Sequence, residues 1–249
     1  MAAALRHPDD DCPYGTCEGD GFVVDEAANS TADCTCRAER IELKRRRRLQ
    51  QQLHRAVPKR YQDLDFDRPP VDEIARLHPD AAAKTRAYVA DLAANLERGR
   101  GLWFFGNKGT GKTSLAYLVA AVAARAGHTV LSWNTITLLN EIRDSFDAER
   151  RRQSTHDIVD AACSVDLLHL EDVSAARTSD WVLEQLYLIV NRRYEDEKAI
   201  VFTSDVPPGA PPVPDVLGDQ IGARTFSRLL EMCGDPLMML GSDMRMALA

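Results

Sequence analysis

The sequence predicts an α/β fold in which a mainly parallel β-sheet carries helices on both faces, with a small cysteine-bearing segment in front of it. Three observations lead to this prediction. Short apolar runs typical of buried strands alternate with segments of helical periodicity from residue 102 to residue 240. A glycine-rich loop follows the first of these strands. Four cysteines lie in two close pairs before residue 37.

The loop at residues 106–113 reads GNKGTGKT and fits the pattern G-x-x-x-x-G-K-[ST]. An apolar strand at 102–105 precedes it, and a helix with one apolar face follows it. Glycines let backbone amides close around phosphate oxygens, and the start of the helix adds positive partial charge. A glycine-rich turn that merely contains Lys-Thr is the alternative. The predicted phosphate-binding residues are Gly106, Asn107, Lys108, Gly109, Thr110, Gly111, Lys112 and Thr113.

Two side chains of this loop have specific expected roles in binding a nucleoside triphosphate. Lys112 would reach the β- and γ-phosphates. Thr113 would place its hydroxyl on Mg²⁺. The loop therefore predicts binding of ATP with Mg²⁺.

Length and composition limit the class of protein. The 249 residues suffice for one sizeable core and a small appendage. The first twelve residues contain no apolar core of a secretion signal, and the longest apolar run, 115–124, is too short to span a bilayer. We therefore expect a cytoplasmic protein without a membrane partner, in which grouped cysteines indicate a metal site.

The cysteine pairs are Cys12 with Cys17 and Cys34 with Cys36, separated by sixteen residues. Two close pairs on either side of a hairpin-sized insert are typical of four thiolate ligands to Zn²⁺. Residues 22–24 would form a strand of the insert. Zinc would supply most of the stability of so short a segment. Free surface thiols are the alternative, whereas Cys163 and Cys233 are expected to be small core residues.

The net charge of −7 is unevenly distributed. Residues 37–60 hold ten Lys or Arg and two Glu, a net charge of +8, and the rest of the chain carries −15. A helix is predicted over 37–55, ended by Pro58, with the basic run 44–48 within it. This run either contacts nucleic-acid phosphates or an acidic partner, or is a solvated charged linker.

These features suggest four segments with a main boundary near residue 60. They are a zinc-binding domain at 1–40, a basic helical linker at 41–60, a connector with a packing helix at 61–98 and the nucleotide-binding core at 99–249. The connector is expected to be extended at 61–71, with Phe66 buried. A helix is predicted over 80–96, ending at Gly99 and packing on the core.

Further strands are predicted at 129–133, 166–170, 199–203 and 237–240, with a helix at 181–194. Sites on such sheets lie at the carboxyl ends of the strands. One strand ends in Glu171-Asp172, as in a Walker B element. Glu171 would lie near Mg²⁺, and Asp172 would orient and deprotonate the attacking water. Solvated loop carboxylates are the alternative, and His169 is expected to be a satisfied core or sheet residue.

The strand at 199–203 ends in Ser204-Asp205. Asp205 could touch the γ-phosphate or the lytic water, or it could form an Asx-type turn before Pro207. Arg224, Arg228 and Arg245 lie after this strand. A guanidinium supplied by a neighbouring subunit would stabilise charge on the transferred phosphoryl group and make hydrolysis depend on assembly.

Together these motifs resemble the DnaC/DnaI-type helicase loaders of bacteria and phages, members of the AAA+ ATPases related to the IstB transposition ATPases. The resemblance covers most of the chain and rests on CPYGTCEGDGF…CTC, the connector at 57–66, GNKGTGKT, DLLHLED, DWVLEQLYLIVNRRY, FTSD and ARTFSRL. It implies that Arg228 is the arginine finger and Arg245 the second sensor. It also implies ATP-dependent delivery of a DnaB-type replicative helicase onto single-stranded DNA by a homo-oligomer, with the front domain gripping the helicase.

The sequence departs from the family pattern in several places. Glu171 stands where Asp is usual, so that the shorter Asp172 is the expected base. Asp205 stands where Asn is usual and would bring negative charge near the γ-phosphate unless it is protonated or turned away, a departure that is compatible with slow hydrolysis. The first cysteine pair is wider than C-x-x-C. The sequence ends soon after Arg245, so that no helical lid domain is expected.

Two other functions are compatible with the same residues. An IstB-like transposition-target ATPase would assemble on double-stranded DNA, although the cysteine knuckle counts against it. A nucleotide-switched adaptor with little turnover would explain Glu171 and Asp205. A P-loop metabolic kinase fits less well, because no acceptor-binding or lid segment is apparent.

Overall fold

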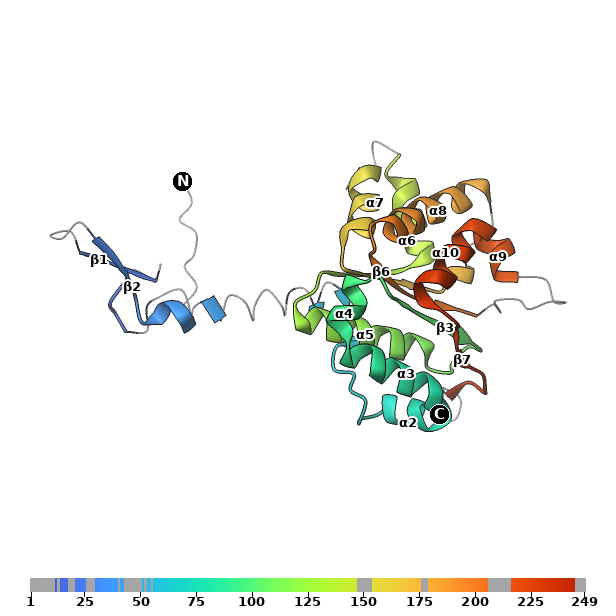
Figure 1. The fold of residues 1–249 in the computed structure, drawn as a ribbon, viewed down its shortest axis with the longest axis horizontal. Helices are drawn as coiled ribbons and strands as arrows, with labels where there is room; N and C mark the ends of the chain where they lie inside the picture. Colours follow the sequence, from blue (N-terminus) through green and yellow to red (C-terminus); the bar gives the residue numbers. More distant parts are fainter. Residues whose placement is uncertain are drawn as a thin grey trace. The chain divides into compact units, whose positions relative to one another are not determined.

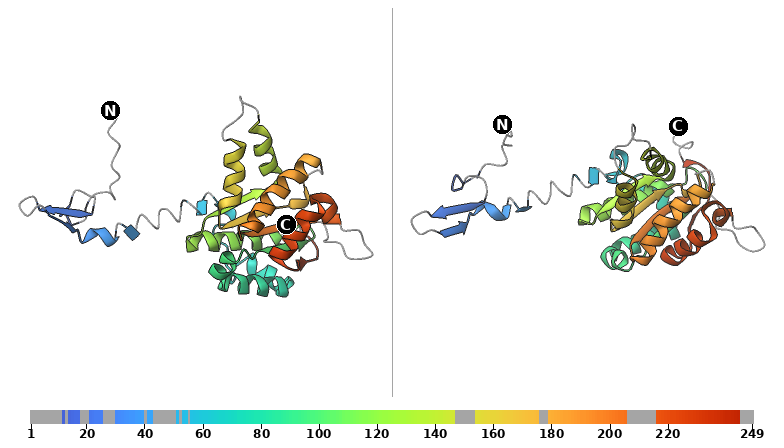
Figure 2. Two further views of the ribbon diagram at one scale, coloured as in Figure 1. Left: turned by 45° about the horizontal axis from the view of Figure 1, so that its top comes forward. Right: turned by 90° about the horizontal axis from the view of Figure 1, so that it is seen from above.

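The computed structural model describes residues 12, 14–17, 21–25, 30–39, 41–42, 51, 53–54, 56–146, 154–175, 179–205 and 216–244 (Figures 1 and 2). The chain forms two compact units, Met1–Gln51 and Gln52–Ala249. Within the described ranges, every helix is too short or too polar to cross a membrane.

The front unit is built on a β-hairpin. Strand β1 (Phe22–Asp25) pairs antiparallel with β2 (Ser30–Asp33), with Phe22 opposite Asp33. The pairing confirms the strand predicted at 22–24, where a Phe-Val-Val run has high β-propensity. Residues 36–39 and 41–42 are helical. The basic run 44–48 lies outside the described residues.

The large unit contains a five-stranded sheet whose strands all pair in parallel. Its order is β4-β5-β6-β3-β7, so that the strand before the glycine loop lies between β6 and β7. The strands begin and end within one or two residues of their predicted limits. They are β3 (Leu102–Gly106), β4 (Val130–Asn134), β5 (Leu167–Glu171), β6 (Ala199–Ser204) and β7 (Leu237–Met239).

Helices cover both faces of this sheet, which confirms the predicted fold class (Figures 1 and 2). Alternate residues of β3 point to opposite faces, with Phe104 in one core and Trp103 in the other. One face carries α2 (Val71–Leu77), α3 (Pro79–Ala90), α4 (Leu92–Glu97) and α5 (Lys112–Ala126). The other carries α6 (Thr135–Asp144), α7 (Thr155–Ser164), α8 (Asp180–Glu195), α9 (Val216–Ile221) and α10 (Ala223–Cys233).

The prediction of a single helix over 80–96 is wrong, because the structure has two helices there, which meet at Asp91. The amide of Asn95 donates a hydrogen bond to the Tyr88 carbonyl at 3.0 Å. Local side-chain bonds of this kind offer the backbone an alternative to a continuous helix. The predicted end at Gly99 agrees with its left-handed backbone, with φ of 63°.

The connector is folded rather than extended, which corrects the prediction for 61–71. A 3₁₀ turn, η2 (Lys59–Tyr61), opens it, and turns follow as far as α2. The Asp65 carboxylate accepts a hydrogen bond from the backbone of Asp67 at 2.9 Å, an Asx turn that bends the chain. Phe66 is half-buried, with the Arg86 guanidinium 4.4 Å from its ring centre.

One buried cation joins the amino ends of two strands to the end of α7. Arg193 is fully buried in α8. Its guanidinium donates hydrogen bonds to the backbone carbonyl oxygens of Ala162, Cys163, Val165, Asp166 and Ala199. These contacts lie at the amino ends of the strands, whereas the glycine loop lies at the carboxyl end of β3. Arg193 therefore stabilises the fold away from the predicted site.

Candidate nucleotide site

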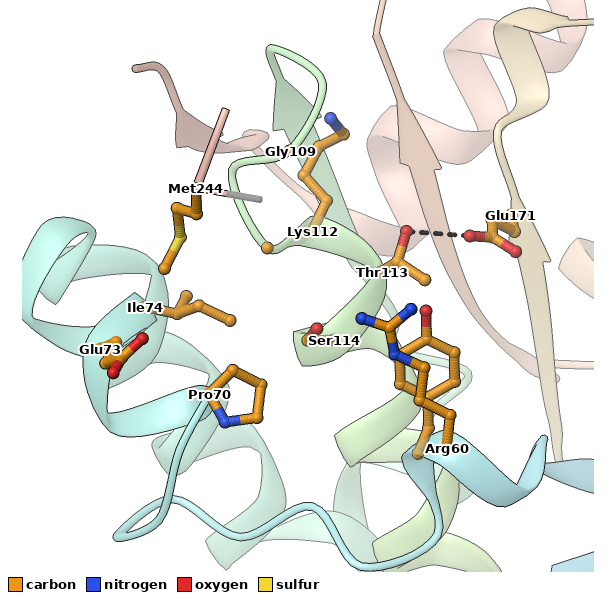
Figure 3. A pocket seen from close by; sticks show the side chains of 12 residues that line it. Arg60, Pro70, Glu73, Ile74, Gly109, Lys112, Thr113, Ser114, Glu171 and Met244 are labelled. Carbon is orange, nitrogen blue, oxygen red and sulfur yellow. Dashed lines mark hydrogen bonds between the residues drawn. The ribbon is translucent and has the colours of Figure 1, made fainter. Parts of the chain in front are cut away.

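The glycine loop begins at the carboxyl end of β3 and leads directly into α5 (Figure 3). Gly109 and Gly111 have left-handed backbones, with φ of 78° and 97°. A Cβ on Gly109 would overlap the Asp243 carboxylate, and one on Gly111 would overlap the Ile74 side chain. Only glycine fits these two positions without strain, as the predicted phosphate-binding geometry requires.

Thr113 and Glu171 meet beside this loop. The Thr113 hydroxyl donates a hydrogen bond to Glu171 Oε1 at 2.9 Å (Figure 3). Glu171 is the last residue of β5, and its carbonyl accepts a hydrogen bond from the Thr135 hydroxyl at 2.9 Å. A hydroxyl and a carboxylate in contact are hard oxygen donors, so that this donor set fits Mg²⁺ that keeps water and phosphate as its other ligands.

Lys112 is buried, with 7% of its side chain exposed. Its Nζ donates hydrogen bonds to the carbonyls of Gly106 at 2.8 Å and Asn107 at 2.7 Å. The same Nζ lies 2.8 Å from Asp205 Oδ1. The structure therefore brings the predicted phosphate-binding lysine together with the carboxylate that was expected near the γ-phosphate or the lytic water. The Asx-turn alternative at Asp205 involves residues 206–207, which lie outside the described ranges.

Asp172 lies next to this ion pair. Its backbone is left-handed, with φ of 56°, and its N–H donates to the Thr203 hydroxyl at 2.8 Å. Burial, followed by the negative charge of Asp205, raises the pKa of Asp172, while a hydrogen bond from Ser174 opposes the rise. A carboxylate with a raised pKa at the end of a buried strand is suited to accept a proton from water.

A cavity of about 260 Å³ adjoins the loop. In the view of Figure 3, Ile74 and Met244 lie on one side of it and Arg60 and Glu171 on the other. Its lining combines polar groups of the loop with an apolar wall, as a nucleotide's phosphates and base require. The lining residues are Arg60, Tyr61, Pro70, Glu73, Ile74, Gly109, Gly111, Lys112, Thr113, Ser114, Glu171 and Met244.

Sequence reasoning assigned no nucleotide role to the connector residues in this wall. Tyr61 lies stacked on Tyr117 of α5, with ring centres 4.5 Å apart and an interplanar angle of 9°. The stack holds η2 against α5 and so brings Arg60 to the cavity. Tyr61 in the run 57–61 was the available signal, since aromatic residues are uncommon in unstructured charged segments.

His169 is buried as predicted, but it is not satisfied, which corrects the expectation for this residue. Neither ring nitrogen has a hydrogen-bond partner among the described residues. The Tyr117 ring meets it edge-on at 4.5 Å and 85°. Burial lowers the pKa of His169 to about 3, so that the ring is neutral at physiological pH.

The two predicted arginines that the structure describes, Arg224 and Arg228, do not line the cavity. Arg228 lies on α10, and its guanidinium stands over the rings of Tyr187 at 5.0 Å and Tyr194 at 5.5 Å. Arg224 is exposed in the first turn of α10. Arg245 lies outside the described residues. Arg228 is therefore not part of the cavity beside the glycine loop of its own chain.

The four front cysteines come together. All their sulfur atoms lie within 4.8 Å of one another, with 3.7 Å between Cys12 and Cys34 and 3.5 Å between Cys17 and Cys36. Tetrahedral Zn²⁺ with Zn–S bonds of about 2.3 Å needs sulfur atoms about 3.8 Å apart. The donor set fits zinc. The wide first pair closes through a turn at Gly15, whose N–H donates to the Cys12 carbonyl at 3.1 Å.

Sequence comparison identifies related proteins. The family of IstB-like ATP binding proteins matches residues 35–236. The phage-like element PBSX protein XkdC of Bacillus subtilis is 26% identical over 213 residues, which cover 83% of this chain and 73% of that protein. The chromosomal replication initiator protein DnaA of Thermus thermophilus is 31% identical over 127 residues, covering 49% of this chain and 28% of that protein.

Solved structures share the fold of the large unit. A crystal structure of the DnaC helicase loader aligns with a TM-score of 0.60 at 24% identity, covering 74% of this chain and 99% of that chain. A crystal structure of DnaI aligns with a TM-score of 0.54 at 19% identity, covering 76% of this chain and 93% of that chain. These likenesses confirm the predicted AAA+ fold.

Proposed function

Because the chain belongs to the family of IstB-like ATP binding proteins, we propose that its glycine loop binds ATP with Mg²⁺ and that the large unit hydrolyses it. The observation that supports this most is the contact between Thr113 and Glu171 beside Lys112, at the carboxyl edge of a parallel sheet. Lys112, Thr113 and Glu171 all line the same cavity, and two of them offer oxygens that suit Mg²⁺.

Each residue has a distinct role in this proposal. The amides of the loop hold the phosphates, and Lys112 exchanges its present partners for the β- and γ-phosphates. Thr113 and Glu171 would hold Mg²⁺, which when bound neutralises charge on the phosphates. Asp172 orients the attacking water and accepts its proton. The apolar wall of Pro70, Ile74 and Met244 receives the base.

We further propose that the ATP-bound protein delivers a DnaB-type replicative helicase onto single-stranded DNA. The zinc knuckle motif in front of an AAA+ fold, on which the resemblance to helicase loaders rests, supports this role. The front unit would grip the helicase. Arg228 would act on the nucleotide of a neighbouring copy, which fits its position away from its own loop and makes hydrolysis depend on a homo-oligomer.

Size-exclusion chromatography of the protein with its host's replicative helicase tests this function. We expect co-elution that depends on ATP, and helicase activity on single-stranded DNA circles that depends on the protein. Lys112→Ala should abolish both. Lys198→Ala is the matched control, because Lys198 pairs with Asp166 at the amino end of β5, away from the glycine loop. Helicase loading by Lys112→Ala at the wild-type rate would refute the ATP-driven part.

Two other functions remain as alternatives with their own support. The family match favours an IstB-like ATPase that prefers double-stranded DNA, and the preference between single and double strands separates it from a loader. The Lys112–Asp205 ion pair favours a switch with little turnover. Single-turnover hydrolysis in the presence of DNA and helicase separates a switch from an enzyme, since a switch retains its ATP.

A further inference from the structure

The ammonium group of Lys112 uses its hydrogen-bonding capacity within the protein. A lysine ammonium has three donors. Lys112 places three oxygens within 2.8 Å of Nζ, two of them backbone carbonyls and the third the Asp205 carboxylate. Of these three, only Asp205 carries a charge. A phosphate that approaches Lys112 must therefore replace an anion, not only neutral carbonyls.

The position of Asp205 is fixed by the sheet and by one hydroxyl. Ser204 pairs with Phe105 in the register of β6 and β3, so that Asp205 follows β6 beside the first residue of the loop. The N–H of Asp205 donates to Ser174 Oγ at 3.1 Å, and the same hydroxyl donates to Asp172 Oδ1 at 3.2 Å. This backbone bond keeps the carboxylate of Asp205 close to the phosphate-binding loop when Lys112 turns to a ligand.

Diphosphates and triphosphates meet this carboxylate differently. Both need Lys112, and both therefore displace it from Asp205. In the proposed binding mode a triphosphate would also bring a terminal phosphate to the ends of β5 and β6, which Asp172 and Asp205 directly follow. Repulsion between charges is strong in a partly buried site, because few water molecules screen it. Asp205 has only 26% of its side chain exposed.

We propose that Asp205 is a specificity-determining residue that competes with the terminal phosphate for Lys112 and thereby favours ADP over ATP. This inference rests on the proposed nucleotide site and deepens it. The carboxylate weakens the binding of both nucleotides by holding Lys112, and it weakens triphosphate binding further by repulsion. A cation from another molecule would then be needed to bind ATP tightly, which couples the triphosphate state to assembly.

Three variants of the full-length protein test the role of Asp205. Asp205→Asn keeps the shape and removes the charge, whereas Asp205→Glu keeps the charge. Asp160→Asn is the matched control, because Asp160 forms an ion pair with Arg192 at 2.8 Å outside the cavity. Titration calorimetry with Mg²⁺ measures the affinity of each for ADP and for a non-hydrolysable ATP analogue. Circular dichroism verifies that each variant is folded.

We expect Asp205→Asn to raise the ratio of the affinity for the ATP analogue to the affinity for ADP by about tenfold. Asp205→Glu and Asp160→Asn should keep the wild-type ratio of the two affinities. An equal gain for both nucleotides in Asp205→Asn, or a gain for ADP alone, overturns the inference and leaves the proposed function intact. Binding of neither nucleotide by the wild-type protein overturns both.

Discussion

Carboxylates at the ends of two neighbouring strands determine the electrostatics of the candidate site. Glu171 contacts a hydroxyl, Asp205 contacts an ammonium, and Asp172 contacts the hydroxyl of Ser174. All three are carboxylates at strand ends, yet each has a different partner: the Thr113 hydroxyl, the Lys112 ammonium and the Ser174 hydroxyl. Motif spacing predicted the positions of these acids, but not the ion pair of Asp205. That contact depends on β6 lying beside β3, which spacing along the chain does not determine.

His169→Leu should stabilise the protein. The substitution removes two buried nitrogens without hydrogen-bond partners among the described residues and keeps an apolar side chain of similar size. We expect the free energy of unfolding to rise by about 1–3 kcal/mol at pH 7. Urea unfolding followed by tryptophan fluorescence measures it. The three tryptophans, Trp103, Trp133 and Trp181, all lie in the large unit, so that the signal reports that unit alone.

The same variant should change the dependence of stability on pH. The pKa of His169 is about 3 in the folded protein, and an unfolded histidine has a pKa of about 6.5. Between these values the unfolded chain binds a proton that the folded chain excludes, so that stability falls as the pH falls. The wild-type protein should lose about 2 kcal/mol from this cause between pH 7 and pH 5. Equal losses in wild type and His169→Leu would contradict this explanation, and the exposed His156→Leu is the control.

At the scale of elements, the strands and the helix after the loop could be predicted because their apolar residues follow periods of two and 3.6. The break at Asp91 and the folded connector could not, because side-chain bonds from Asn95 and Asp65 decide them locally. The sequence did not predict the apolar wall of the cavity either, because that wall also depends on contacts between distant residues. Tyr61 reaches the cavity only through its stack on Tyr117, and no motif records that contact.

Arg193→Met should destabilise the large unit strongly. Burial lowers the pKa of Arg193 to about 10, so that it remains charged at pH 7, and its bonds to five carbonyls join α7, β5 and β6. Removing the guanidinium leaves buried carbonyls without donors, and we expect a loss of about 3 kcal/mol or more in the free energy of unfolding.

The adjacent Arg192 provides the control for this prediction. It is half-exposed and forms an ion pair with Asp160 on the surface. Surface pairs of this kind contribute about 0–1 kcal/mol, so that Arg192→Met should change little. Similar urea midpoints for the two variants would show that the buried bonds of Arg193 do not hold the strands together.

At the scale of the whole molecule, the sequence joins a cysteine-bearing unit to an AAA+ fold through a strongly basic segment. The two units have separate sources of stability. The large unit has a core on each face of its sheet, whereas the described part of the front unit has a two-stranded hairpin, a short helical stretch and four clustered sulfurs. A hairpin of this size is marginal in water without further support. We therefore expect bound zinc to stabilise the front unit and to have little effect on the stability of the large unit.

Cys34→Ser should lose zinc without losing nucleotide binding. Cys34 is buried within the sulfur cluster, and one missing thiolate leaves the tetrahedral site incomplete. We expect about one zinc per wild-type chain by elemental analysis and close to none in the variant. Cys163→Ser, which changes a buried thiol of the large unit, should retain the metal. Full zinc content in Cys34→Ser would rule out the four-sulfur site.

The central claim is that the glycine loop and Lys112 bind the phosphates of ATP, and titration calorimetry of the zinc-loaded, full-length protein with ATP and Mg²⁺ tests it most directly. We predict saturable binding to the wild-type protein and an affinity about 100-fold lower for Lys112→Ala, which lacks the charge-assisted bonds to phosphate. No binding heat from the wild-type protein, or equal affinities for the two proteins, would contradict the claim.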